Sequence, residues 1–196
     1  MAREAVQRRT TAETDIAVAV NLDGTGRAKV ATGIGFFDHM LTAFARHGRI
    51  DLDVSVTGDL QVDGHHSVED TGIVIGRALA CALGEKAGIN RYGSAFVPMD
   101  EALVLAALDI SGRGQLHWAV EAPFGMVGDF DTQLAREFFI ALAANAGITL
   151  HVRQLAGDNV HHIFEATFKA VGRALRAAVA VDPALSGAVP STKGVL

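Results

Sequence analysis

Residues 65–83 read HHSVEDTGIVIGRALACAL, and residues 161–179 read HHIFEATFKAVGRALRAAV. Nine of these 19 aligned positions are identical, and each stretch opens with His-His-x-x-Glu and continues to Gly-Arg-Ala-Leu. Apolar residues recur at helical spacing in both, which predicts two similar amphipathic helices. A repeat about half the chain long indicates a duplicated unit and not a solenoid.

The segments around these two helices predict the same order of elements in each half. In the first half we expect strands at 14–22, 27–32 and 50–57 and helices at 36–47 and 66–83. In the second half we expect strands at 101–110, 115–121 and 148–154 and helices at 131–146 and 162–181. The turn signal Asp-Gly-Thr-Gly at 23–26 predicts that 27–32 returns as the hairpin partner of 14–22.

The predicted fold class is therefore α+β, with two duplicated halves of the order strand-strand-helix-strand-helix and with helices packed on one face of mixed sheets. We expect a single domain over residues 1–196. Its parts are a first pseudo-repeat at 5–90, a second at 91–182, and an irregular Gly/Ser/Pro-rich tail at 183–196.

Composition excludes several classes of protein. About half of the 196 residues are apolar and a fifth are charged, as in ordinary globular proteins. The net charge of −5 gives no reason to expect nucleic-acid binding. The sequence has no apolar run long enough to span a membrane, and we expect no secretion signal. The single cysteine, Cys81, lies in an apolar stretch where we expect a buried thiol, so a cytoplasmic location is expected.

The His-His-x-x-Glu pentads have the side chains of a metal site. On a helix the first histidine and the glutamate share a face at i and i+4, whereas adjacent histidines point about 100° apart. Each pentad should therefore serve two ions, or one ion and a neighbouring subunit. Imidazole and carboxylate ligands suit Mn, Fe, Zn, Co or Ni. One pentad alone could be a solvated helix start, but two at matching positions argue against that alternative.

The duplication adds two further ligands. His39 lies nine residues before Gly48, and Glu137 lies ten residues before Gly147, so with one gap they are counterparts. The predicted metal ligands are thus His39, His65, His66, Glu69, Glu137, His161, His162 and Glu165. Eight ligands divide into two sites of four. An octahedral ion held by four ligands keeps two positions open for water or substrate, as in a catalytic site.

Four segments resemble the imidazoleglycerol-phosphate dehydratase family of histidine biosynthesis. They are residues 35–41 (GFFDHML), 64–70 (GHHSVED), 159–166 (NVHHIFEA) and 190–196 (PSTKGVL), and the resemblance runs from about Ala5 to Leu196. Some members carry His where this chain has Glu137. The resemblance implies a fold like domain 2 of ribosomal protein S5. It also implies two Mn(2+) ions per subunit, bound at subunit interfaces of a homo-oligomer that is a 24-mer built from trimers.

The resemblance also implies a reaction. The phosphorylated imidazole substrate, D-erythro-imidazole glycerol phosphate, would lose water to give imidazole acetol phosphate, through a metal-bound imidazolate and a diazafulvene-like intermediate. Glu13 would contact substrate and transfer protons together with Glu165. The alternative interpretation of Glu13 is a surface carboxylate without a role in the site. Asp100 is a weaker catalytic candidate that could orient a ligand. His47 is either a site residue or a helix C-terminal cap.

Substrate and phosphate binding would involve basic and hydroxyl side chains, which suit phosphate oxygens. By resemblance this set contains Glu13, His39, His47, Arg91, Arg113, Lys169, Ser191, Thr192 and Lys193. Each basic residue alone could equally be solvated surface.

Two other classes of function stay open on the residues alone. A metal-storage or structural metal protein would need the ligands but no phosphate donors. A small-molecule kinase can share such a fold but needs a Gly-rich phosphate loop, and Gly33-Ile34-Gly35 is a poor match to one.

Overall fold

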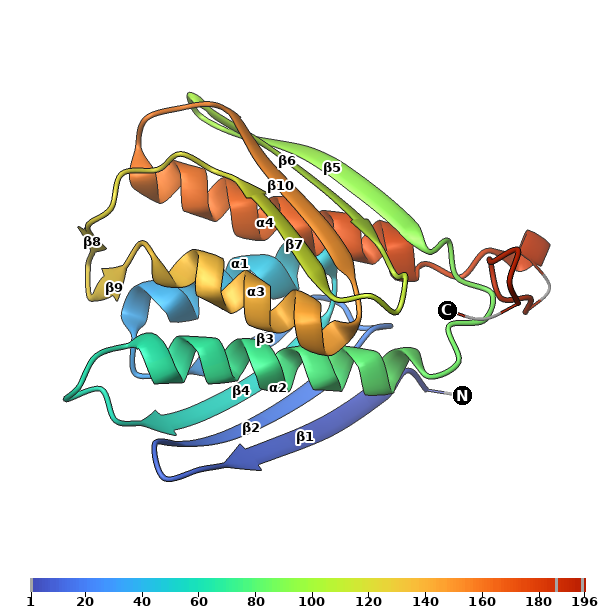
Figure 1. Ribbon diagram of the computed structural model, residues 1–196, viewed down its shortest axis with the longest axis horizontal. Coiled ribbons are helices and arrows are strands. Elements are labelled where there is room, and N and C mark those ends of the chain that lie inside the picture. The colour runs from blue at the N-terminus through green and yellow to red at the C-terminus, as the bar shows by residue number, and fades with distance from the viewer. Residues whose placement is uncertain (1, 186, 195) are drawn as a thin grey trace.

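Two four-stranded sheets enclose four helices in the computed structural model, which describes residues 2–185, 187–194 and 196 (Figure 1). The first half contains β1 (Glu4–Thr10), β2 (Thr14–Asn21), β3 (Ala28–Ala31), α1 (Gly35–Gly48), β4 (Asp51–Gly58) and α2 (His65–Leu83). The second half contains β5 (Tyr92–Met99), β6 (Ala102–Asp109), β7 (Gln115–Ala119), β8 (Met126–Val127), β9 (Phe130–Asp131), α3 (Leu134–Ala146), β10 (Thr149–Ala156) and α4 (Val160–Val179). A 3-10 turn, η1 (Pro183–Leu185), follows.

The two sheets have the same topology. Their strand orders are β1-β2-β4-β3 and β5-β6-β10-β7, and in each sheet the last pair is parallel while the others are antiparallel. The predicted α+β class with two similar halves and mixed sheets is confirmed. No helix in the described ranges is both long and apolar enough to cross a bilayer.

Each half begins with one strand more than we predicted. The sequence of β1 lacks the apolar alternation of a strand, and only Ala5 of its seven residues is buried. β5 contains Gly93 and Pro98, which are unfavourable inside a sheet. Both are edge strands, where a proline and weak patterning are tolerated because one side needs no partner.

The predicted hairpin between 14–22 and 27–32 is wrong. β3 instead pairs in parallel with β4, which lies between β2 and β3. The carboxylate of Asp51, at the start of β4, accepts hydrogen bonds from the backbone N–H groups of Thr25, Gly26 and Arg27 at 2.8, 3.0 and 2.9 Å. It also binds the Arg27 guanidinium. These contacts hold residues 25–27 at the start of β4, so β3 pairs with the edge of β4 that is opposite β2.

The helices cross between the halves, so the halves cannot be separate units. α1 packs on α4, and α2 packs on α3 (Figure 1). Glycines of the repeated Gly-Arg-Ala-Leu segments make both crossings close. A Cβ at Gly172 would lie 2.5 Å from the Phe44 carbonyl oxygen, and one at Gly76 would lie 2.8 Å from the Leu142 carbonyl oxygen. Only glycine permits backbones to approach in this way.

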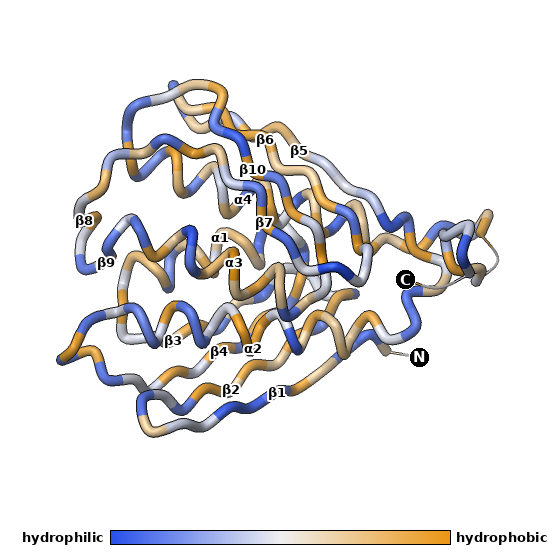
Figure 2. The backbone as a smooth tube through the Cα atoms, viewed as in Figure 1, coloured by the Kyte–Doolittle hydropathy of each residue, from blue (hydrophilic) through white to orange (hydrophobic). Residues whose placement is uncertain are grey.

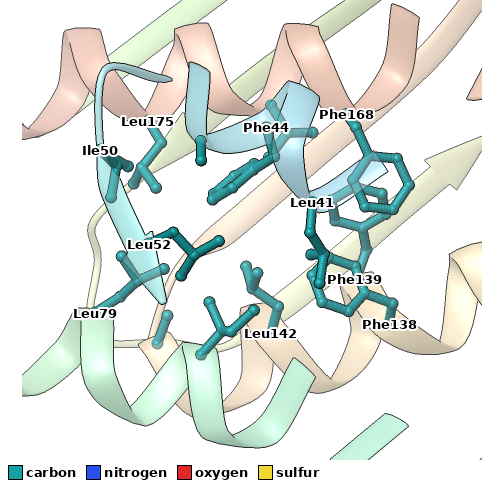
Figure 3. Close-up of a cluster of buried hydrophobic side chains, with 14 of the residues drawn as sticks. Leu41, Phe44, Ile50, Leu52, Leu79, Phe138, Phe139, Leu142, Phe168 and Leu175 are labelled. Carbon is teal, nitrogen blue, oxygen red and sulfur yellow. The ribbon is translucent and has the colours of Figure 1, made fainter. Parts of the chain in front are cut away.

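The core lies between the sheets and fills the space around these crossings. Figure 3 shows aromatic and aliphatic side chains from α1, α2, α3, α4 and β4 meeting there. The helices are amphipathic along their length, with apolar segments toward the core (Figure 2). Cys81, in contrast, is exposed, so the prediction of a buried thiol is wrong. It lies on the outward side of α2, between the inward-facing Ala78 and Ala82.

Gly172→Ala should destabilise the protein by about 1–3 kcal/mol, because the added methyl would overlap the Phe44 carbonyl oxygen and force α1 and α4 apart. Urea unfolding measures the change. Gly125→Ala is the control, since a Cβ there meets no atom within 4 Å. Equal stability of the two variants would contradict a close α1–α4 crossing.

Asp51→Asn should lower stability at pH 7 by about 1–2 kcal/mol, since a charged acceptor is lost. In the folded protein the pKa of Asp51 is held below its ordinary value, mainly by the Arg27 hydrogen bond. The difference between wild type and variant is therefore fully present above the unfolded pKa, about 3.9, and fades as pH falls toward the folded pKa. Urea midpoints between pH 7 and 3 would show this convergence, and a pH-independent difference would contradict it.

Candidate active site

The two pentads occupy the first turns of α2 and α4, as predicted. In α4 the Asn159 side-chain oxygen accepts a hydrogen bond from the His162 backbone N–H at 3.3 Å and caps the helix. The rings of His161 and His162 lie 6.2 Å apart at an interplanar angle of 83°, and those of His65 and His66 lie 6.2 Å apart at 85°. Adjacent histidines therefore point into different surroundings.

One cluster joins the two halves of the protein. His39 of α1 lies beside His161 and Glu165 of α4, and one ligand atom from each lies within 4.8 Å of the other two. The Glu165 Oε2 atom is 3.5 Å from His39 Nε2 and 3.2 Å from His161 Nε2. The two histidine side chains are 48% and 43% exposed, so this cluster opens to solvent.

Glu165 is buried, with 8% of its surface exposed. Burial opposes its ionisation, but the hydrogen bond and charge of Lys169 outweigh burial and lower the pKa of Glu165. The Lys169 Nζ atom lies 2.7 Å from Glu165 Oε1. Glu165 is thus a carboxylate with one oxygen bound to lysine and the other turned toward two imidazoles.

The two histidines of the first pentad contact different carboxylates. His65 Nε2 lies 3.6 Å from Glu69 Oε2. His66 contacts two other carboxylates: its Nδ1 is 3.0 Å from Asp59 Oδ2, and its Nε2 is 3.8 Å from Glu13 Oε1. The hydrogen bond with Asp59 raises the pKa of His66.

The second histidine of the other pentad has matching surroundings. His162 Nδ1 lies 2.8 Å from Glu101 Oε2, and His162 Nε2 lies 3.6 Å from Asp100 Oδ2. The hydrogen bond with Glu101 raises the pKa of His162 and lowers that of Glu101 to about 2. Asp100 and Glu13 occupy corresponding places, since each stands in the turn between the first two strands of its half.

Glu137 lies on α3 and lines a 530 Å³ cavity together with Trp118 and Phe164. Within the described ranges, the one group of three or more ligating side chains with ligand atoms this close is the His39 cluster, and Glu137 is not in it. Glu137 nevertheless has the same position relative to the α2–α3 crossing as His39 has relative to the α1–α4 crossing. His39 and Glu137 each lie five residues before the carbonyl that meets the crossing glycine, Phe44 or Leu142.

His47 lies two turns after His39 on α1, among basic residues of α4. Burial lowers the pKa of His47, and the charges of Lys169 and Arg173 lower it further. The helix ends next to it, at Gly48, and the following residue, Arg49, supplies the left-handed C-cap. The charge of Lys169, which contacts the cluster, therefore also acts on His47.

The predicted phosphate-binding residues Arg91 and Arg113 lie at the other end of the molecule. Arg91 donates hydrogen bonds to the Asp109 carboxylate at 2.7 and 3.2 Å and to the Pro190 carbonyl at 2.8 Å. The Arg91 backbone N–H donates a hydrogen bond to the Ala178 carbonyl oxygen. Ala178 lies 17 residues after His161 on α4, a separation of about 25 Å along the helix axis. Arg113 is 63% exposed and lies 3.9 Å from Asp109.

The C-terminal tail lies at the same end as Arg91, far from the pentads (Figure 1). The backbone of Leu196 approaches Gly112 in the Ser-Gly-Arg-Gly turn. Ser191, Thr192 and Lys193 lie between Pro190 and this contact, and the Ser191 hydroxyl accepts a hydrogen bond from the Lys193 N–H at 3.2 Å. One chain therefore does not bring the tail to the His39 cluster.

Sequence patterns indicated Asp100 but missed Asp59 and Glu101, the carboxylates that pair with Nδ1 of the second histidines. Asp59 follows the end of β4, and Glu101 completes the two-residue turn between β5 and β6. Asp100, in the same turn, has a positive φ of 49°, which is uncommon outside glycine. The sequence feature that could have indicated these residues is an acidic side chain in or just after the turn that ends a strand. Solvated loops have the same pattern, so the feature is not specific.

Fold and site together define a class: a duplicated α+β protein with a candidate metal site where its halves meet. Comparisons with known proteins agree with this class. The profile of the imidazoleglycerol-phosphate dehydratase family matches residues 32–175. The chain belongs to this family and is a hydro-lyase that carries out its dehydration step in histidine biosynthesis.

Individual relatives cover the full chain. The imidazoleglycerol-phosphate dehydratase of Azorhizobium caulinodans is 60% identical over 99% of this chain and 98% of its own length. That of Roseobacter denitrificans is 63% identical over 96% of both. The Pyrococcus furiosus crystal structure, a complex with (S)-C348, is 42% identical with a TM-score of 0.84 and covers 97% of this chain and 100% of its own. The Staphylococcus aureus structure is 38% identical with a TM-score of 0.83 over 91% and 99%.

Proposed function

We propose that this enzyme converts D-erythro-imidazole glycerol phosphate to imidazole acetol phosphate with two Mn(2+) ions per subunit. The observation that carries the proposal is the His39–His161–Glu165 cluster, which holds two imidazoles and one ionised carboxylate within 4.8 Å of one another. This donor set fits a divalent first-row ion. Its solvent exposure fits a catalytic position and not a closed structural site.

The first ion would be held by His39, His161 and Glu165. The Glu165 Oε2 atom lies 3.5 Å from His39 Nε2 and 3.2 Å from His161 Nε2, a spacing that suits donor atoms around a single ion. The ring plane of the second histidine in each pentad is at 83–85° to that of the first, and this second ring contacts other carboxylates, Asp59 or Glu101. His66 and His162 would therefore complete sites on neighbouring copies of the chain, each oriented by its carboxylate partner.

The second ion would be held by His65, Glu69 and Glu137. Glu69 and Glu165 each lie seven residues before a crossing glycine, Gly76 or Gly172, so the α2–α3 and α1–α4 crossings have the same register. That register supports Glu137 as the counterpart of His39.

When bound, the metal supplies Lewis acidity and a template for the imidazole ring of the substrate. In the overall reaction the C–O bond beside the ring breaks and the hydroxyl leaves as water, through a diazafulvene-like species. A C–H bond of the substrate's glycerol portion then breaks to give an enol, which ketonises. The protein's own task is to deliver one proton to the departing hydroxyl and to remove one from carbon.

Glu13 is the proposed group for this proton transfer. Its side chain is 53% exposed and lies 3.8 Å from His66, which supports a place for Glu13 beside the site that His66 would complete on a neighbouring copy. Thr11 fixes the turn, because its hydroxyl accepts hydrogen bonds from the N–H groups of Glu13 and Thr14 at 3.1 and 3.0 Å. Glu165 would assist from the cluster, and Asp100 would orient His162.

Phosphate binding would combine groups from more than one copy of the chain. Lys169 and His47 lie near the cluster, whereas Arg91, Arg113 and the Ser191–Lys193 tail lie about 25 Å away in the same chain. A substrate of this size cannot span that gap. We therefore propose a homo-oligomer in which the tail end of one copy meets the cluster end of another. The family resemblance implies that this oligomer is a 24-mer built from trimers.

His161→Ala and Glu165→Gln should each remove Mn(2+) from one site and lower kcat/KM at least about 100-fold. Metal content by atomic emission and product formation from imidazole glycerol phosphate measure both effects. His117→Ala is the matched control, because His117 is an exposed histidine stacked on His151 outside the cluster. Full metal content in both variants would reject the site, and metal binding without turnover in wild type would favour a storage function.

Mixing two inactive variants tests the shared site. His161→Ala damages the cluster end and Arg113→Ala the proposed phosphate end, so oligomers re-assembled from both should contain some sites that carry neither substitution. Activity should then exceed that of either variant alone. Activity no higher than the average of the two parents would show that one chain supplies the whole site.

A further inference from the structure

The connection between β7 and α3 contains a hairpin that the first half lacks. Residues 120–133 lie between these elements, whereas only residues 32–34 lie between the corresponding β3 and α1. Strands β8 and β9 form the hairpin, with Gly128 and Asp129 at its turn. It stands at the edge of the molecule where α3 begins (Figure 1).

Asp129 in this turn caps a helix of the other half. Its Oδ2 atom accepts a hydrogen bond from the Gly35 N–H at 2.9 Å, and its Oδ1 atom accepts one from the Phe36 N–H at 3.4 Å. Ile34, at the N-cap position of α1, provides no side-chain cap. A carboxylate at a helix N-terminus satisfies free N–H groups and interacts favourably with the helix dipole.

The two helices that carry the pentads are capped locally. In α2 the His65 N–H donates to Asp63 at 2.7 Å, and in α4 the His162 N–H donates to Asn159. Among these three helices, the one that carries His39 takes its cap from a distant part of the chain, 94 residues away.

The residue after Asp129 strengthens the same contact. Phe130 is fully buried, and its ring lies 5.5 Å from that of Phe36 and 5.8 Å from that of Phe37. The Phe36 ring in turn lies 5.1 Å from the His161 ring. The hairpin therefore fixes both the backbone and the aromatic side chains of the first turn of α1, directly before His39.

We infer that Asp129 is a positioning residue, which sets the placement of α1 along its axis so that His39 can share a metal ion with His161 and Glu165. This inference rests on the proposed metal site. Metal–ligand distances tolerate only about 0.2 Å, so loss of the cap would weaken ion binding even if the helix stays folded.

The two proposed sites should respond differently to loss of this cap. The helices of the second site start on hydrogen bonds to carboxylates other than Asp129: the His65 N–H at the start of α2 donates to Asp63, and the Gln133 N–H just before α3 donates to Asp131. Loss of the Asp129 cap should therefore weaken one of two Mn(2+) sites per subunit and leave the other unchanged.

Two variants remove the cap from opposite sides. Asp129→Ala removes the acceptor. Gly35→Pro removes the main donor and places the ring Cδ where the N–H faced Asp129, so it also displaces the carboxylate. Proline otherwise suits the first position of a helix, and Ile34 before it has the extended φ of −120° and ψ of 104° that proline requires. Calorimetric titration of metal-free protein with MnCl₂ should show about tenfold weaker binding at one site in both variants.

Three further proteins complete the test. Gly35→Ala keeps the N–H and places its Cβ in ordinary contact with Asp129 at 3.8 Å, so it should bind as wild type. Asp182→Ala removes a carboxylate that caps a remote turn at Ala184 and should also bind as wild type. His161→Ala should lose one site entirely.

The outcomes separate the two claims. Wild-type affinity in Asp129→Ala and Gly35→Pro, with one site lost in His161→Ala, would overturn the positioning role but leave the metal site intact. Equal weakening of both sites would also overturn it, because a general loss of stability would then explain the effect. Two intact sites in His161→Ala would reject the metal site itself. If Asp129→Ala does not fold, Gly35→Pro decides the question alone.

Discussion

The close crossing of α1 and α4 is the contact on which the candidate site depends. His39 belongs to the first half, whereas His161 and Glu165 belong to the second, so no half contains the cluster alone. The crossing is close because Gly172 meets the backbone of α1 at Phe44 without a side chain between them. The glycine of the repeated Gly-Arg-Ala-Leu segment thus sets the distance between α1 and α4, and with it the distance of His39 from His161 and Glu165.

Carboxylates hold every histidine of the two pentads in the described structure. His65 and His161 pair with the glutamate of their own pentad, while His66 and His162 pair with acidic residues from strand-end turns. At His66 and His162 the carboxylate pairs with Nδ1, which fixes the orientation of the imidazole and leaves Nε2 as the other possible ligand atom. In our proposal this division separates histidines that bind an ion within the chain from those that bind an ion on a neighbouring copy, which gives the adjacent histidines their different roles.

Much of this could be predicted from the sequence, because the duplication supplied an internal comparison. The two pentads, their helices and the correspondence of His39 with Glu137 all follow from aligning the halves. The pairing of β3 could not be predicted, since it depends on hydrogen bonds from the N–H groups of residues 25–27 to Asp51, which lies 24 to 26 residues away. β1 and β5 were missed because edge strands need little apolar patterning. Asp129 was missed because a helix cap from 94 residues away leaves no local signal.

The most direct test of the shared metal site is anomalous X-ray diffraction at the manganese edge, from crystals of the full chain grown with MnCl₂. We predict a peak about 2.0–2.2 Å from His39 Nε2, His161 Nε2 and a Glu165 oxygen of one subunit. We also predict that the remaining protein ligand comes from a histidine of another copy. A map with no manganese peak between α1 and α4, in crystals of protein that turns over its substrate, would contradict the central claim.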